Sequence, residues 1–293
     1  MAVALAVMLI TPALADQLDD YVKLQMEKQR IPGLSLAIVK NGQIAKLQSY
    51  GLANIELNIA TTPDTVFKIG SLSKPFIATG IMLLVADGKV ALTDKVVKFL
   101  NGAPDAWDSV TVQHVLSHTS GLAREAPGFD PLKDQPDADV IKSAYGVPLA
   151  FPPGERWQYS NLGYFVLAEI ISKASGKPWP EFLDERVFRP LGMTSTHVTN
   201  MTAIIPNRAS GYVIRNDHYE NAPIILAVRP SGALLSSVTD LLRWDAALSN
   251  GHLLSTSTLE AMWTPAKLRN GEVARYGLGW QLDAGRVVYL GWI

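Results

Sequence analysis

The order of strand-like and helix-like segments constrains the fold of this chain more than any other sequence feature. Residues 34–39 and 44–50 are two strand-like runs joined by Asn41-Gly42, a pair that predicts the tight turn of an antiparallel hairpin. Helical patterns then occupy the middle of the chain. Strand-like segments return near the end, at residues 210–214, 222–228, 276–282 and 286–290.

This order predicts an α/β (α+β) architecture, with a mostly antiparallel sheet flanked by helices and a helical part inserted between its strands. We expect residues 16–75 and 205–293 to form one discontinuous α/β domain. Residues 76–204 are expected to form the inserted helical domain. A site in such a protein is expected in the cleft between the two parts.

The expected helices follow from apolar periodicity and from residues that start or stop helices. Asp87-Gly88 and Gly176 are typical helix ends, whereas the Pro/Gly-rich residues 102–154 are expected to be largely irregular. The expected helices are residues 16–29, 71–86, 112–116, 162–175, 180–188 and 239–249.

The first fifteen residues predict a signal peptide, residues 1–15, and hence a periplasmic or secreted protein. An apolar run at 2–10 precedes Ala13-Leu14-Ala15, a small-x-small cleavage pattern. The positively charged start of such peptides is missing, so a start further upstream or an ordinary apolar N-terminus stays an alternative. No later apolar run is long enough to cross a bilayer, and we expect no membrane span once the signal is removed.

Charge and cysteine content exclude several classes of function. Lys and Arg number 26 against 27 Asp and Glu, so a net charge of −1 provides no electrostatic basis for nucleic-acid binding. The chain has no cysteine, which removes disulfides, thiolate nucleophiles and cysteine metal sites. His114 and His118 have metal-ligand spacing, but no third ligand accompanies them. We expect no metal and no cofactor.

The segment 70–75 (GSLSKP) contains the strongest candidate for a reactive group. Pro75 lacks an N–H and is comfortable only in a first helical turn, so the helix is predicted to begin near Ser71. The Ser71 hydroxyl would lie at the positive end of the helix dipole, with Lys74 on the same face. An amine beside a hydroxyl can act as its base when burial lowers the amine pKa. Taken alone, the motif also fits an ordinary helix start with a solvated lysine.

A second candidate segment is Tyr159-Ser160-Asn161, which begins 88 residues after Ser71 and directly precedes a predicted helix. A phenol beside a lysine can move protons, and the Asn161 amide can hold a substrate or the lysine. A helix cap by Ser160 or Asn161, with Tyr159 as a packing residue, is the structural alternative.

Together these segments resemble those of the serine β-lactamase and penicillin-binding family, in its class C-like branch. That branch includes class C β-lactamases, family VIII carboxylesterases and D-stereospecific peptidases. The resemblance covers nearly the whole chain after Ala15 and implies a β-lactamase/transpeptidase-like fold. It is carried by residues 67–74 (FKIGSLSK), 115–122 (VLSHTSGL), 152–164 (PPGERWQYSNLGY), 190–193 (PLGM) and 231–237 (SGALLSS).

The resemblance implies roles for the candidate residues. Ser71 would attack a carbonyl carbon, Lys74 and Tyr159 would move the proton, and Asn161 would contact the substrate or Lys74. Water would then release the acyl group from Ser71. Which of Lys74 and Tyr159 is the base in each step stays open.

The C-terminal segment departs from the family pattern. The third motif of the family is a strand carrying Lys-Thr-Gly, or His-x-Gly or Trp-x-Gly in esterase relatives, and it supplies an oxyanion-hole N–H. The nearest match is Tyr289-Leu290-Gly291, two residues from the end, and we expect Tyr289 and Gly291 to contact substrate. The C-terminal helix of the family is missing as well, so we expect a truncated reading frame with impaired activity.

These features predict a serine hydrolase that cleaves small carboxylic esters, or related amides, through an acyl-Ser71 intermediate. A class C-type β-lactamase, a D-amino-acid peptidase and a catalytically defective relative that binds penicillin or peptidoglycan-like peptides are the alternatives. No Gly-x-Ser-x-Gly elbow is present. His118 is expected to brace the loop before Gly121 rather than to act as a base. The expected partner is a small-molecule substrate, and the sequence predicts no particular oligomeric state.

Overall fold

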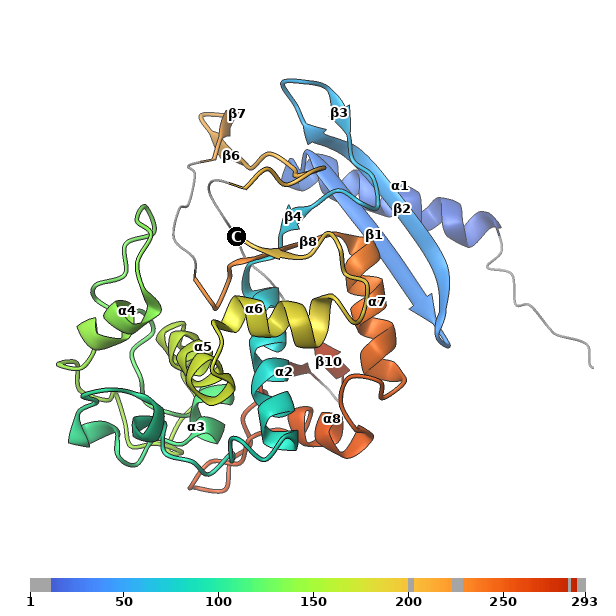
Figure 1. Cartoon of the computed structure of the whole chain (residues 1–293). Coiled ribbons are helices and arrows are strands. Elements are labelled where there is room, and N and C mark those ends of the chain that lie inside the picture. Colours follow the sequence, from blue (N-terminus) through green and yellow to red (C-terminus); the bar gives the residue numbers. More distant parts are fainter. Residues whose placement is uncertain (1–11, 200–202, 223–228, 284–285, 289–293) are drawn as a thin grey trace, which may run out of the picture.

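The computed structural model of the chain describes residues 12–199, 203–222, 229–283 and 286–288. Every strand pair in this part of the chain is antiparallel, and an isolated parallel bridge joins Val66 to Arg208. Helices and antiparallel sheets alternate in the predicted order, so the predicted α/β fold class is confirmed (Figure 1). The division into domains at 76 and 204 stays a prediction.

The N-terminal layer is a helix followed by a hairpin. Tyr50 of the second strand donates a hydrogen bond to Asp19 of the helix, so the helix lies against the sheet (Figure 1). Asn41 and Gly42 both have positive φ, 52° and 74°, as a type I′ turn requires, and the predicted hairpin is confirmed. The elements are α1 (Pro12–Gln29), β1 (Gly33–Lys40), β2 (Gln43–Asn54) and β3 (Ile59–Ala60).

A small three-stranded sheet connects the candidate nucleophile to distant parts of the chain. Its strands are β4 (Phe67–Lys68), β8 (Leu234–Ser236) and β5 (His197–Val198), in the order β4-β8-β5. A short 3₁₀ turn, η1 (Gly70–Leu72), follows β4 and continues into α2 (Ser73–Ala86). The helix predicted over residues 71–86 is therefore confirmed, with its first turn wound more tightly than an α-helix.

The helical part surrounds α2. Residues of α2 and α5 form the centre of one apolar core, because both helices are buried on nearly every face. The predicted helices at 112–116 and 162–175 are confirmed to the residue, and Gly176 ends the second in a left-handed conformation. The elements are η2 (Val96–Phe99), η3 (Asp105–Trp107), α3 (Val112–Leu116), α4 (Asp137–Ser143), α5 (Leu162–Ser175), α6 (Trp179–Leu183) and η4 (Asp184–Phe188).

The C-terminal part differs from the sequence prediction in its strands. Residues 276–280 were expected to be extended but are not a strand, because two glycines let the backbone pack directly on neighbouring helices. A Cβ at Gly277 would lie 2.1 Å from the Met262 carbonyl oxygen, and one at Gly279 would lie 2.3 Å from the Ala78 Cβ. The elements are β6 (Tyr212–Arg215), β7 (His218–Asn221), α7 (Val238–Ser249), α8 (Thr256–Met262), β9 (Gln281–Asp283) and β10 (Arg286–Val288).

Two other predicted strands are shifted or only partly described. The strand expected at 222–228 falls almost entirely outside the described residues, and the partner of β6 is β7, which ends at Asn221. Asn216 and Asp217 form the two-residue turn between them, each with positive φ. Of the strand expected at 286–290, the structure describes residues 286–288.

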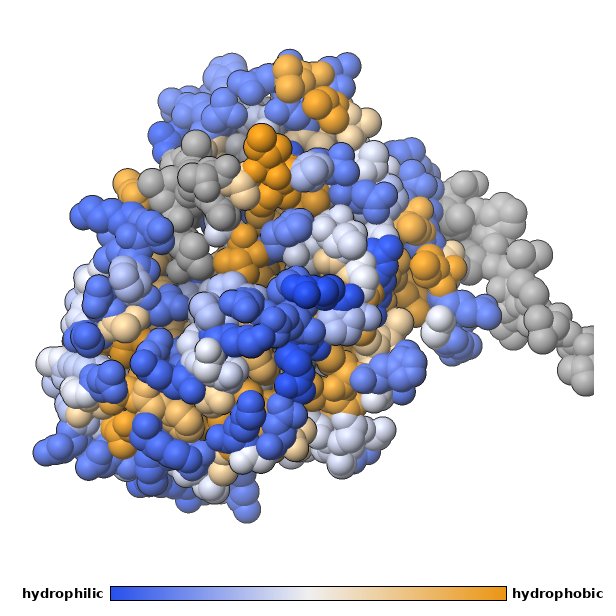
Figure 2. All heavy atoms as spheres, in the orientation of Figure 1, coloured by the Kyte–Doolittle hydropathy of each residue, from blue (hydrophilic) through white to orange (hydrophobic). Residues whose placement is uncertain are grey.

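One face of the molecule is largely polar (Figure 2). On the face seen in Figure 2, hydrophilic side chains cover most of the helical part, and apolar side chains form separated patches between them. Within the described residues, no helix combines the length and apolar character needed to cross a bilayer.

Candidate active site

The backbone around Ser71 presents its hydroxyl at the start of a buried helix. Gly70 has φ +52°, a left-handed conformation that turns the chain sharply out of β4. Ser71 follows in the first turn. The backbone N–H groups of a first turn have no partner within the helix, and they form the positive end of the helix dipole. Ser71 is half-buried, so part of this residue is exposed to solvent.

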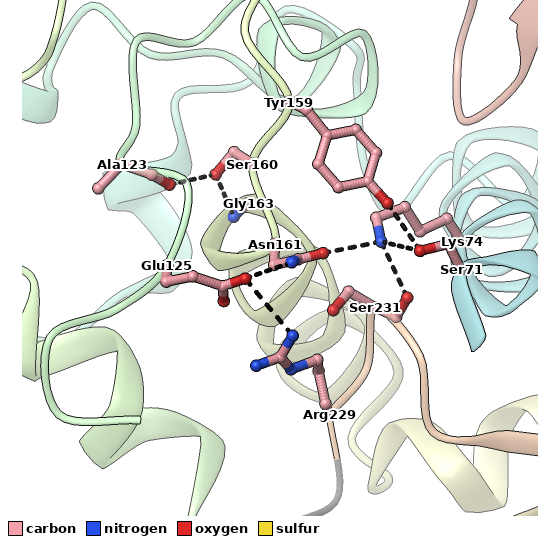
Figure 3. A network of polar contacts seen from close by, with 10 residues as sticks. All are labelled: Ser71, Lys74, Ala123, Glu125, Tyr159, Ser160, Asn161, Gly163, Arg229 and Ser231. Carbon is pink, nitrogen blue, oxygen red and sulfur yellow. Dashed lines mark hydrogen bonds and ion pairs between the residues drawn. The ribbon is translucent and has the colours of Figure 1, made fainter. Parts of the chain in front are cut away.

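Lys74 lies beneath Ser71 and is completely buried. Its Nζ is 3.3 Å from Ser71 Oγ, 2.9 Å from Asn161 Oδ1 and 2.9 Å from the backbone oxygen of Ser231 (Figure 3). A buried lysine is rare unless its amine is fully hydrogen-bonded, and these contacts meet that requirement.

Burial and the nearby charges favour the uncharged form of Lys74. Burial is the main cause that holds the pKa of Lys74 well below 10.5, and the positive charges of Arg229 and Arg124 lower it further against the opposing effect of Glu125. A neutral amine has two N–H groups, which match Asn161 Oδ1 and the Ser231 oxygen at the shorter distances. The nitrogen lone pair is then directed to the remaining neighbour, Ser71 Oγ, and can accept its proton.

Tyr159 completes the contact with Ser71 from the other side. Its hydroxyl lies 2.8 Å from Ser71 Oγ, at normal O–H···O distance (Figure 3). The Lys74 Nζ lies 4.6 Å from the centroid of the Tyr159 ring. Ser71, Lys74 and Tyr159 thus form a cluster in which one hydroxyl contacts both an amine and a phenol.

Asn161 has a fixed amide orientation, because its two ends contact groups of opposite character. Oδ1 accepts from Lys74, while Nδ2 donates to Glu125 Oε1 at 2.5 Å. Arg229 lies 3.4 Å from the same Glu125 oxygen and 4.1 Å from the centroid of the Phe129 ring. Lys74, Asn161, Glu125 and Arg229 therefore form one polar chain leading away from Ser71 (Figure 3).

The helix-cap alternative applies to Ser160 and not to its neighbours. The Ser160 hydroxyl donates to the Ala123 oxygen at 2.6 Å and accepts from the Gly163 N–H at 3.0 Å, at the start of α5 (Figure 3). Tyr159 and Asn161 project instead toward Ser71 and Lys74. The segment 159–161 therefore combines one capping side chain with two site side chains.

Several site residues were not predicted from the sequence. The sequence analysis did not name Glu125 or Arg229 as site residues. Glu125 lies three residues after the family-like segment 115–122, so its position could have made it a candidate. Ser231 contributes its backbone oxygen, an atom that every residue has, so the sequence identifies only the family-like segment 231–237 in which Ser231 lies. Tyr289 and Gly291, predicted to contact substrate, lie outside the described residues.

The two histidines considered as metal ligands have structural contacts. His114 accepts the Thr111 N–H through Nδ1 at 3.2 Å and caps α3, while His118 Nδ1 accepts the Ser160 N–H at 3.1 Å. Among the residues that the structure describes, no three or more side chains of ligand type gather as a metal site.

The fold, with its helices and antiparallel sheets, is of the β-lactamase and transpeptidase-like class. The sequence model of the Beta-lactamase family matches residues 18–292, and the chain belongs to that family. The resemblance inferred from the sequence motifs is thereby confirmed.

The chain is similar to penicillin-binding proteins and to an amidase. Penicillin-binding protein 4* of Bacillus subtilis (strain 168) is 34% identical over 287 residues, covering 89% of this chain and 63% of the relative. The octameric penicillin-binding protein homologue from Pyrococcus abyssi has a TM-score of 0.81 at 28% identity, over 93% of this chain and 66% of that one. D-amino acid amidase from Ochrobactrum anthropi SV3 has a TM-score of 0.80 at 27% identity, over 94% of this chain and 85% of the amidase. The chain spans about half to two thirds of the length of the curated relatives, from 47% to 63%.

Proposed function

We propose that this protein cleaves small carboxylic esters, or related amides, through a covalent acyl-Ser71 intermediate. The observation that carries the proposal is the position of Ser71 Oγ, 2.8 Å from the Tyr159 hydroxyl and 3.3 Å from the Lys74 amine. A hydroxyl becomes nucleophilic when a positioned base removes its proton, and this arrangement offers both a base and a proton relay. A relative named as an amidase supports the same reaction class.

The proposed acylation begins with neutral Lys74, which accepts the Ser71 proton as Oγ attacks the carbonyl carbon. The Ser71 N–H, at the start of the helical turn, donates to the negative oxygen that forms. The proton reaches the leaving group through the Tyr159 hydroxyl, and the alcohol or amine departs. Water then attacks the acyl-enzyme by the reverse route, which restores Ser71 and releases the acid.

An ester is the preferred substrate in this proposal, because an alkoxide leaves with less help from an acid than an amide nitrogen needs. Hydrolysis of short p-nitrophenyl esters, of a D-amino-acid amide and of a fluorescent penicillin would be compared, with the intact mass of the protein recorded during each reaction. Ester turnover with a transient adduct on Ser71 is expected. A penicillin adduct without any turnover would contradict the proposal and favour a binding relative. Faster hydrolysis of the penicillin or of the amide would favour a β-lactamase or a peptidase.

We also propose that the protein is exported, on the strength of the apolar run at 2–10 and the pattern Ala13-Leu14-Ala15. Expression of the full chain in a bacterium and fractionation of the cells are expected to yield a periplasmic protein that begins at Asp16. N-terminal sequencing would detect this, and an uncleaved protein confined to the cytosol would contradict it.

Replacing Tyr159 with phenylalanine is expected to lower kcat by about a hundredfold or more, the usual effect of losing a positioned acid or base. The ring and its packing stay, so the melting temperature should change little. Steady-state kinetics with an ester would measure the effect. A variant within a factor of about two of the wild type would show that Tyr159 only packs.

The pH dependence of ester hydrolysis should follow the charge on Lys74. Activity needs the neutral amine, so kcat/KM should fall as the pH decreases through a Lys74 pKa that burial holds well below 10.5. Glu125→Gln removes a charge that raises this pKa, so the pH at which kcat/KM falls should move to a lower value. Arg229→Gln removes a charge that lowers the Lys74 pKa, so the pH at which kcat/KM falls should move to a higher value. Shifts in the same direction would exclude Lys74 as the titrating group.

A further inference from the structure

His118 holds the backbone on both sides of Tyr159. The Gln158 N–H donates to the His118 backbone oxygen at 2.8 Å, and the Ser160 N–H donates to His118 Nδ1 at 3.1 Å. The imidazole is completely buried, and its centroid lies 4.5 Å from that of the Tyr159 ring. One residue therefore contacts the backbone N–H groups of both sequence neighbours of Tyr159 and the ring itself.

The backbone of His118 is itself in an uncommon conformation. Its φ is +59°, in the left-handed region that costs most non-glycine residues about 1 kcal/mol or more. The chain keeps this conformation because the loop closes around it, with the His118 N–H donating to the Val115 oxygen and the Thr119 N–H to the His114 oxygen. Such conformations tend to persist where the surrounding structure needs a side chain in one place.

The protonation state of His118 follows from its partners. Because Ser160 N–H donates to Nδ1, the ring proton must be on Nε2. Burial is the main cause that holds the pKa of His118 well below its usual value, and a positive charge on Lys74, when it is protonated, lowers that pKa further. The rings of Tyr159, Tyr164 and Tyr276 surround it, with centroids 4.5, 5.3 and 4.7 Å away. The imidazole therefore stays neutral and keeps its acceptor for Ser160.

We propose that His118 is a positioning residue for Tyr159, whose phenol it keeps within hydrogen-bond distance of Ser71. His118 does not exchange protons with substrate in this role. Its Nδ1 and its backbone oxygen set the path of residues 158–160, and its ring limits the tilt of the phenol. Its effect on rate rests on the proposed hydrolase function, whereas its effect on the position of Tyr159 does not.

The test compares His118→Asn with His118→Gly. Both residues tolerate positive φ and both remove the ring, but glycine also leaves the Ser160 N–H without its acceptor, so His118→Gly should be the less stable of the two variants. Only asparagine places an acceptor, Oδ1, where Nδ1 lies. We expect His118→Gly to lower kcat about a hundredfold with KM nearly unchanged, the scale of a small misplacement of a reacting group. His118→Asn should keep kcat within about fivefold of the wild type.

Two further measurements keep the outcomes separate. Val140→Ala, a core truncation in α4, controls for lost stability and should not change kcat at temperatures well below unfolding. Crystal structures of both His118 variants would measure the distance from Ser71 Oγ to the Tyr159 hydroxyl, expected near 2.8 Å in His118→Asn and longer in His118→Gly. An unchanged distance in His118→Gly, or equal kcat in the two variants, would overturn the proposal. Wild-type protein that hydrolyses no ester would remove the proposed function but leave the distance test intact.

Discussion

Replacing Ser71 with alanine is expected to abolish covalent labelling and to lower ester turnover by at least about ten-thousandfold. The change removes the oxygen that contacts both the Tyr159 hydroxyl and the Lys74 amine. It removes a single oxygen from a half-buried turn, so the fold and the melting temperature should be preserved. Intact mass after incubation with an activated ester, together with steady-state rates, would measure both effects.

Ser73 provides a matched control two residues away. It is completely buried, and its Oγ accepts the Leu234 N–H at 3.0 Å, in the sheet that supports the nucleophile. Ser73→Ala leaves that donor unpaired and should lower the free energy of unfolding by about 1–3 kcal/mol while acyl labelling persists. The two serines should therefore separate chemistry from stability. Wild-type turnover in Ser71→Ala would remove Ser71 as the nucleophile.

Replacing Lys74 with methionine is expected to lower kcat by about a thousandfold, within the range for a lost general base. Methionine fills a similar volume but cannot accept a proton. Lys74→Arg tests the base directly, because a guanidinium is positively charged at any usable pH and cannot accept the Ser71 proton. Both variants should be inactive across the pH range in which the wild type hydrolyses esters.

Lys68 is the control for the loss of a nearby positive charge. It lies in β4 and is half-buried, and burial is the main cause that lowers its pKa. Lys68→Met should keep kcat within about fivefold of the wild type, because Lys68 is not one of the proposed acid or base groups, whose loss has much larger effects. An active Lys74→Arg would show that charge alone is needed and that another group, with Tyr159 the nearest, is the base.

Local sequence signals were sufficient for most helices, whereas the reacting cluster was predicted only from several motifs considered together. The helix 162–175 is defined by dense apolar residues and by Gly176, both of which act within a few residues. The first turn of α2 follows from Pro75, which fits few other places. Ser71, Lys74 and Tyr159 were predicted from the order of two motifs and their resemblance to a family, because each motif alone also fits an ordinary helix start.

The parts that were not predicted depend on contacts between distant segments. The helix α4 lies in a Pro/Gly-rich stretch whose composition favours a loop, and its buried Val140 and Ile141 provide a core contact that local propensity does not reveal. Glu125 and Arg229 are ordinary charged residues until the fold places both beside Asn161. Every residue has a backbone carbonyl, so only the folded structure identifies the one of Ser231 as a partner of Lys74.

The separation of the site residues along the chain has a consequence for folding kinetics. The hydrogen bond between Ser71 and Tyr159 closes a loop of 88 residues, and the one between Lys74 and Ser231 closes a loop of 157 residues. A helix such as α2 can form within about a microsecond, whereas contacts of high sequence separation form late because loop closure must precede them. During refolding, the chain should therefore acquire helical circular dichroism well before it becomes competent for acylation. The rate at which Ser71 becomes labelled thus reports the final closure of the molecule, which spectroscopic signals of helix content do not follow.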